Sequence, residues 1–186
     1  MENVSQSTIK GTGVVAGVAY AEAVWVRPRP ELPTAGELID EEKRDGEYDR
    51  FLEAVDVVAS RLEQRAAGAE GQAAEVLGAT AGMVKDRGWH KAVRKSIRSG
   101  RPAEYATASA TEKFVTLFEA AGGVMAERTT DLKDVRDRVI AQLRGEQEPG
   151  LPMVSGEAVL LADDLAPADT ATLDTAHIKA LVTELG

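Results

Sequence analysis

The 186-residue sequence contains no cysteine and few aromatic residues. Without cysteine the chain forms no disulfide and offers no thiolate, which fits a reducing compartment such as the cytoplasm. Aromatic residues make up 4% of the chain, so the core must consist mainly of Ala, Val and Leu, which favours closely packed helices. No segment approaches the roughly 18 to 20 apolar residues of a membrane-spanning helix. The N-terminus also lacks the pattern of a secretory signal, so we expect a cytoplasmic protein without a membrane partner.

Positive charge is in deficit, since 22 Lys and Arg face 31 Asp and Glu and the net charge is −9. This deficit argues against a nucleic-acid partner, whose phosphates are bound by Lys and Arg. A basic protein partner is compatible with it, because opposite fields speed the encounter. The simpler interpretation is that the acidity keeps the protein in solution.

Glycines and β-branched residues dominate the N-terminal part of the chain. The segment Thr8–Val26 predicts two short strands joined by a turn or bulge. Its Gly11-Thr12-Gly13 start does not favour a nucleotide-binding loop, because a strand-like run rather than a helix follows. Pro28, Pro30 and Pro33 then exclude a regular element and predict a stiff linker.

Helical periodicity begins after this linker. Thr34–Glu37 has the capping-box pattern, in which the hydroxyl and the carboxylate satisfy free N–H groups at a helix start. Apolar residues then repeat at steps of three and four, at Tyr48, Phe51, Leu52, Val55, Val58, Ala59 and Leu62. Further periodic segments predict a second helix after Gly71, a third ending at Gly100, a fourth ending at Gly122 and a fifth ending at Gly145.

The pattern changes again after residue 146. A proline-containing linker leads to an apolar strand at 157–162, a short helix at 167–173 and a second strand at 178–182. Because strands flank the helical segment on both sides, we expect them to share one sheet, with the helices inserted.

The predicted fold is therefore mixed α and β and mainly helical. An antiparallel-type helical bundle, residues 34–146, is inserted into a small and incomplete α/β subdomain. Residues 1–33 supply the first strands of that subdomain, and residues 147–186 return to it.

Three segments carry distinctive motifs. They are Gly11–Ala19 (G-T-G-V-V-A-G-V-A), Glu127–Asp137 (E-R-T-T-D-L-K-D-V-R-D) and Ala162–Ala171 (A-D-D-L-A-P-A-D-T-A). Their patterns, order and spacing resemble the N-terminal region of Enzyme I, the phosphoenolpyruvate-dependent protein phosphotransferase of the bacterial sugar phosphotransferase system. The proline-rich segment Trp25–Pro33 resembles the actinobacterial branch. The resemblance covers almost the whole chain and implies a helical subdomain that docks the phosphocarrier HPr.

The resemblance also implies roles for individual residues. Thr170 takes the place of the threonine that orients the phosphorylated imidazole. Arg128 takes the place of an arginine near the phosphorylation site of the docked carrier, where a guanidinium suits phosphate oxygens. The carrier-binding surface would include Met83, Lys85 and Asp86.

One departure from the family pattern lies next to that surface. Where the family usually has bulkier apolar residues, this chain has the small residues Ala79–Gly82.

In the family, the phosphorylated histidine follows a strand like Leu181–Gly186 by a few residues. We therefore expect no catalytic residue in this chain and no autophosphorylation. Phosphoenolpyruvate and Mg²⁺ bind the family's C-terminal barrel, so we expect no cofactor or metal here. The family's dimer contact lies in the same barrel, which leaves the open edge of the strand at 178–182 as the expected place of self-association.

The histidines and the aspartates near the C-terminal strands allow other interpretations. His90 is expected to be an exposed helix residue and His177 to precede a strand, so neither is expected to accept a phosphoryl group. Asp163, Asp164 and Asp169 could suggest a metal site, but Asp residues at a strand-to-helix turn are explained by capping.

Three rival functions remain open from the sequence. One is a free-standing helical module for protein interaction. Another is a fragment of a different phosphoenolpyruvate-utilising enzyme, such as a synthase or dikinase, although those families lack the inserted helical subdomain. The last is the nitrogen-regulatory paralogue of Enzyme I.

Overall fold

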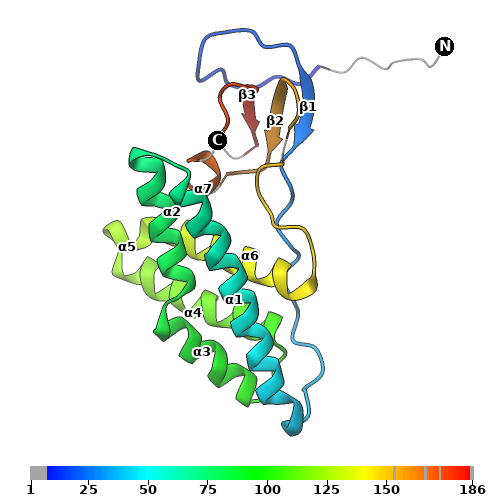
Figure 1. Cartoon of the computed structure of the whole chain (residues 1–186), viewed down its shortest axis with the longest axis vertical. Coiled ribbons are helices and arrows are strands. Elements are labelled where there is room, and N and C mark those ends of the chain that lie inside the picture. The colour runs from blue at the N-terminus through cyan, green and yellow to red at the C-terminus, as the bar shows by residue number, and fades with distance from the viewer. Residues whose placement is uncertain (1–7, 153, 166, 172, 185–186) are drawn as a thin grey trace, which may run out of the picture.

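The computed structural model describes residues 8–152, 154–165, 167–171 and 173–184. A helical block lies below a small sheet (Figure 1). The helices are α1 (Arg44–Ala67), α2 (Gly71–Val84), α3 (Arg87–Arg98), α4 (Ala103–Ala121), α5 (Gly123–Glu127), α6 (Thr129–Arg144) and α7 (Pro167–Thr170), with a 3-10 turn, η1 (Glu41–Lys43), before α1. The strands are β1 (Glu22–Trp25), β2 (Ala158–Ala162) and β3 (Ile178–Thr183). The prediction of a mixed, mainly helical fold is confirmed.

The sheet is parallel, in the order β1-β2-β3. Glu22 pairs with Ala158, and Leu160 pairs with Leu181. The chain leaves β1, builds α1 to α6 and returns as β2 beside β1, so the helical block is the connection between two neighbouring parallel strands. This confirms that strands from both ends share one sheet. The division of the chain into domains, and self-association through β3, stay predictions.

The core of the block follows the predicted apolar stripes. The side chains of Phe51, Val55 and Leu62 on α1 are fully or almost fully buried. The 24-residue α1 therefore buries one face against the rest of the block, while its charged residues face solvent. On α3, Trp89, Val93 and Ile97 are buried, and the Trp89 indole N–H donates to Thr111 Oγ1 at 3.0 Å.

The first predicted strand is wrong. Residues 8–20 form no strand and lie exposed, and only Glu22–Trp25 enters the sheet. β1 pairs with β2, and the structure shows no further strand alongside it among the described residues. Strand propensity without a partner is not enough to form a ladder.

The start of α1 was also predicted too early, at Thr34–Glu37, whereas the helix begins at Arg44. Ile39 N–H donates to the carbonyl of Gly100 at 2.8 Å, so this segment is held extended against the α3–α4 connection. In addition, the predicted fifth helix is interrupted at Arg128, which separates α5 from α6.

Candidate functional site

The turn between α2 and α3 carries Met83, Lys85 and Asp86. The half-buried Met83 packs against the core, and the exposed Lys85 Nζ lies 2.6 Å from Glu63 Oε1 on α1. Asp86 caps α3 by accepting a hydrogen bond of 2.7 Å from the backbone N–H of Trp89. Asp86 therefore stabilises the start of α3, independently of any contact that it makes with a partner.

His90, which was expected to be exposed, is half-buried. Its ring packs edge-on against Phe51, with centroids 5.4 Å apart. Its Nε2 lies 2.8 Å from the carbonyl oxygen of Val84, so the histidine fastens α3 to the end of α2. The exposed His177 pairs with Asp174 at 2.6 Å just before β3.

Arg128 lies at the junction of α5 and α6 and is exposed. The nearby Asp131 is half-buried, and this burial raises its pKa, while the positive charge of Arg128 opposes that shift. Two apolar side chains precede Arg128 on α5 and remain in solvent, Val124 at 69% and Met125 at 41% exposure. Since residues three and four positions apart share a helix face, Val124, Met125 and Arg128 fall on one side of this short helix.

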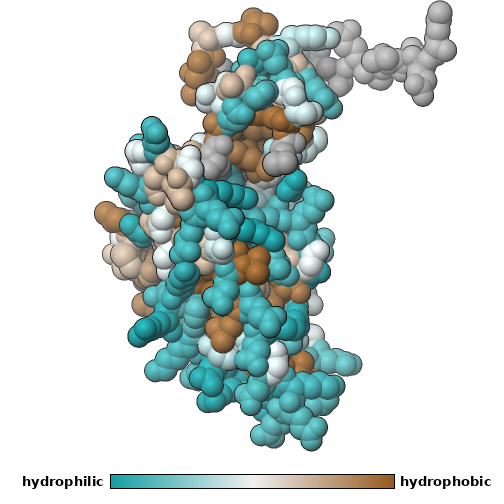
Figure 2. Space-filling model, viewed as in Figure 1, coloured by the Kyte–Doolittle hydropathy of each residue, from teal (hydrophilic) through white to brown (hydrophobic). Residues whose placement is uncertain are grey.

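Aromatic residues of α4 lie between the α2–α3 turn and the α5–α6 junction. A Cβ atom on Gly88, at the start of α3, would lie 3.8 Å from the ring of Phe114. The Phe114 ring meets that of Phe118 edge-on at 6.4 Å, and α4 then leads directly into α5. Figure 2 shows apolar surface at the edge of the block where Figure 1 places α5. Phe114 and Phe118 thus extend from the start of α3 along α4 toward its end, where α5 begins.

Arg128 was predicted from the sequence, whereas Val124 and Met125 were not. Their signal was present, because two large apolar residues directly follow the pair Gly122-Gly123. The positive φ angles of those glycines, 67° and 55°, turn the chain out of α4 into a five-residue helix, which is too short to bury every apolar side chain that it carries.

Thr170 lies at the end of α7, exposed, and its hydroxyl donates to the carbonyl of Pro167 at 3.0 Å. Helix α7 packs against α2 and α6, just below the sheet (Figure 1). Thr170 is therefore on the sheet side of the block, whereas the α2–α3 turn lies farther down it.

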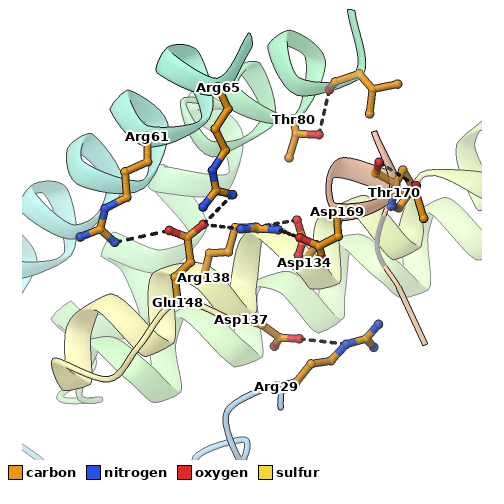
Figure 3. Close-up of polar contacts among 12 residues, drawn as sticks. Arg29, Arg61, Arg65, Thr80, Asp134, Asp137, Arg138, Glu148, Asp169 and Thr170 are labelled. Atoms are coloured by element: carbon orange, nitrogen blue, oxygen red, sulfur yellow. Dashed lines mark hydrogen bonds and ion pairs between the residues drawn. The ribbon is translucent and has the colours of Figure 1, made fainter. Parts of the chain in front are cut away.

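The most extensive polar cluster surrounds Arg138 of α6 (Figure 3). Its side chain has no exposed area and reaches carboxylates from three segments of the chain. The guanidinium donates to Asp134 at 2.8 Å, to Asp169 of α7 at 2.8 Å, and to Glu148 of the linker after α6. Three carboxylates thus share one buried cation.

Further arginines complete the network around Arg138. Arg61 and Arg65 of α1 lie 3.5 and 3.3 Å from the carboxylate of Glu148. On the other side of α6, the buried Asp137 accepts a 2.7 Å bond from Arg136 Nε. Arg29 of the N-terminal linker also approaches Asp137, at 4.0 Å. This network was not predicted from the sequence, although the run D-V-R-D-R from Asp134 is a visible signal of paired charges.

The aspartates of the strand-to-helix turn do not form a metal site. Asp169 is bound by Arg138, and the carboxylate of Asp164 lies 3.7 Å from Arg29. No group of three or more His, Asp or Glu that could hold a metal ion occurs in the part of the chain that the structure describes. Likewise, no described helix is long and apolar enough to cross a membrane.

Burial raises the pKa of Asp137, and the hydrogen bond from Arg136 only partly opposes this shift. A group whose pKa is raised by folding stabilises the folded state once it is protonated. As pH falls from 7 to 4, we expect the free energy of unfolding of the wild type to increase relative to that of Asp137→Asn. Urea titrations at several pH values measure this difference.

Asp174 provides the control of opposite sign. Hydrogen bonds from His177 and from the backbone of Ala176 lower its pKa. Its contribution is present above the ordinary aspartate pKa and is lost as pH falls through the lowered value. The difference between wild type and Asp174→Asn should therefore shrink below about pH 4. If both variants show the same sign of pH dependence, the burial of Asp137 does not control its ionisation.

Comparison with known proteins gives a consistent result. Residues 10–128 match the family described as PEP-utilising enzyme, N-terminal. The phosphoenolpyruvate-protein phosphotransferase of Streptomyces coelicolor is 39% identical over 97% of this chain and 32% of the relative. The Bacillus subtilis protein of the same name is 32% identical, over 96% of this chain and 32% of its own length. The chain thus spans about a third of the length of these relatives.

Solved structures agree with the fold. The solution structure of an Enzyme I protein matches with a TM-score of 0.73 and 26% identity, over 88% of this chain and 68% of that one. A structure described as the N-terminal domain of nitrogen Enzyme 1 shares the fold, with a TM-score of 0.62 and 22% identity over 89% of this chain and 69% of that one. The chain belongs to the N-terminal family of phosphoenolpyruvate-utilising enzymes, in the form found in the N-terminal region of Enzyme I, the phosphoenolpyruvate-protein phosphotransferase.

Proposed function

We propose that this chain docks the phosphocarrier HPr on the side of the helical block that carries the α2–α3 turn and the α5–α6 junction. The observation that carries the proposal is the group Val124, Met125 and Arg128, in which two exposed apolar side chains lie beside an exposed guanidinium. Arginine is enriched among the residues that contribute most to binding energy, and methionine and arginine are both enriched in protein interfaces. Family membership supports HPr as the partner.

Arg128 suits a carrier that bears phosphate. A guanidinium offers planar, paired donors that match two phosphate oxygens, and it stays charged at any physiological pH. The carboxylate of Asp131 lies close enough to interact electrostatically with this charge. Met83, with its adaptable side chain, would extend the contact at the α2–α3 turn.

The reaction proposed for the larger enzyme follows from this placement. In a polypeptide of the relatives' length, phosphoenolpyruvate would phosphorylate a histidine, and that histidine would pass the phosphoryl group to HPr docked on this block. Phosphoenolpyruvate and Mg²⁺ would bind elsewhere in that polypeptide. The contribution of this chain would be to position the two histidines, and Thr170 would orient the imidazole on the enzyme side.

Replacing Arg128 with alanine is expected to weaken HPr binding about tenfold or more, because a charged hydrogen bond to the partner contributes roughly 1.5 to 3 kcal/mol. Arg128→Lys should recover part of the affinity, since it keeps the charge and loses the paired donors. Isothermal titration calorimetry with HPr and with phosphorylated HPr measures both effects.

The matched control is Lys43→Ala, which removes an exposed cation from η1 at the far end of the block. It should leave the affinity within twofold of the wild type. Equal losses in Arg128→Ala and Lys43→Ala would reduce the effect to net charge and would remove Arg128 from the docking site. Tight binding of a basic protein unrelated to HPr would favour the rival function, a general module for protein interaction.

A further inference from the structure

Arg138 joins the two parts of the molecule. It projects from α6 of the helical block, and one of its partners, Asp169, belongs to α7 beside the sheet (Figure 3). Asp169 is itself buried, with 6% of its surface exposed. The pair therefore forms in a dry setting, where a charged hydrogen bond is strong and losing either partner is costly.

Two connections join the helical block to the sheet, one from β1 to α1 and one from α6 to β2. Both pass close to the pair of Arg138 and Asp169. Arg27 of the first connection and Gly150 of the second form an antiparallel bridge, with N–H···O distances of 3.0 and 3.3 Å. Glu148, which also binds Arg138, lies two residues before Gly150. Arg138 thus binds both the connection from α6 to β2, through Glu148, and helix α7, through Asp169.

The backbone conformation of Gly150 and its lack of a side chain allow Asp169 to reach Arg138. Its φ is 106°, a conformation that residues with a side chain rarely adopt. A Cβ atom at this position would lie 2.4 Å from Asp169 Oδ1 and 2.9 Å from its Cγ. The carboxylate of Asp169 therefore rests directly on the glycine backbone, and it reaches Arg138 only because no side chain is there.

We infer that Arg138 is a positioning residue. Through Asp169 it fixes α7, and with it Thr170, in one orientation relative to the HPr-docking side of the helical block. The inference rests on the function proposed above. Helix α7 has four residues, so its own hydrogen bonds cannot define its direction. Its position depends on packing against α2 and α6 and on this ion pair.

Two different changes should release α7. Asp169→Asn removes the charge and keeps the size of the side chain, and Gly150→Ala pushes the carboxylate away and keeps every charge. Residual dipolar couplings measured on the whole chain report the orientation of the sheet and α7 relative to α1–α6. In the wild type one alignment tensor should fit both parts, and in each variant the two parts should require separate tensors.

Three controls isolate the effect. Gly156→Ala adds a methyl group where no atom lies within 4 Å, and Gly145→Ala tests the cost of a positive φ, 67°, in open space. Asp163→Asn removes an exposed carboxylate from the same turn as Asp169. All three should keep the single tensor. If Asp169→Asn and Gly150→Ala also keep it, the inference is wrong.

The enzyme of the relatives' length that contains this region supplies the second readout. With Asp169→Asn, the KM for HPr should stay within twofold, because the docking surface is untouched. The kcat should fall, by up to about a hundredfold, since a misplacement of about 1 Å can have that effect. Of two variants of Arg138 itself, Arg138→Lys should have a higher kcat than Arg138→Met.

The two proposals fail in different ways. If the wild-type chain does not bind HPr, the proposed function is wrong, although the dipolar couplings still report whether Arg138 fixes α7. If HPr binds and the variants change KM rather than kcat, Arg138 supports the docking surface and does not position Thr170, and the inference is overturned.

Discussion

Replacing Arg138 with methionine is expected to lower the free energy of unfolding by about 3 to 5 kcal/mol. The methionine fills a similar volume but leaves Asp134, Glu148 and Asp169 clustered without the cation that they share. Since these carboxylates are mostly buried, water cannot take the place of the guanidinium. Urea denaturation followed by circular dichroism measures the loss.

Two comparisons make this experiment specific. Arg98→Met removes an exposed arginine from α3 and should change stability by less than about 0.5 kcal/mol. Converting Arg138 and its three carboxylate partners together to apolar residues of similar size should recover much of the loss, because a complete buried ion network is often replaceable by packed apolar groups. A loss below about 1 kcal/mol in Arg138→Met would show that the carboxylates find other partners or solvent.

Replacing Phe51 with alanine should be similarly damaging, with an expected loss of about 3 to 5 kcal/mol. The side chain is completely buried on α1 and lies at the centre of an aromatic group. Its ring stacks on Tyr48 at 5.9 Å and meets the edges of Trp89 and His90, each at 5.4 Å. The cavity would therefore open between α1 and α3, where few neighbouring side chains can relax to fill it.

The matched control for Phe51 is Leu117→Ala on α4, where the side chain is 65% exposed. Its effect should stay within about 0.5 kcal/mol. The His90 ring provides a local readout of the Phe51 change, because loss of the edge contact should shift its proton resonances. Equal stability of Phe51→Ala and Leu117→Ala would contradict the packing described for α1 and α3.

The sequence predicted what depends on local patterns. The apolar stripe that contains Phe51 and Val55 was recognised, because burial of one helix face repeats every three or four residues. The helix ends at Gly100 and Gly122 were recognised for the same local reason. Long-range pairing was harder. The expected strand within residues 8–20 has the right residue types, but a strand also needs a neighbour, and the sequence alone does not reveal one.

In the candidate site, too, local patterns could be predicted from the sequence and long-range contacts could not. Arg128 and Thr170 were predicted through motifs that resemble a known family, and their roles stay predictions. The pair of Arg138 and Asp169 was missed, because the partners are 31 residues apart and nothing in either segment indicates the other. The i, i+4 pair of Arg138 and Asp134 was within reach of sequence reasoning, but its burial was not. Exposure of Val124 and Met125 likewise depends on how α5 leaves the end of α4.

A titration of the isotopically labelled chain with HPr, followed by backbone amide shifts, tests the central claim most directly. We expect saturable shifts that cluster at Met83–Asp86 and Val124–Arg128, while residues of the sheet stay unchanged. The same titration with Arg128→Ala should require about ten times more HPr to saturate. No shifts at high micromolar HPr, or shifts confined to the sheet, would contradict docking on the helical block.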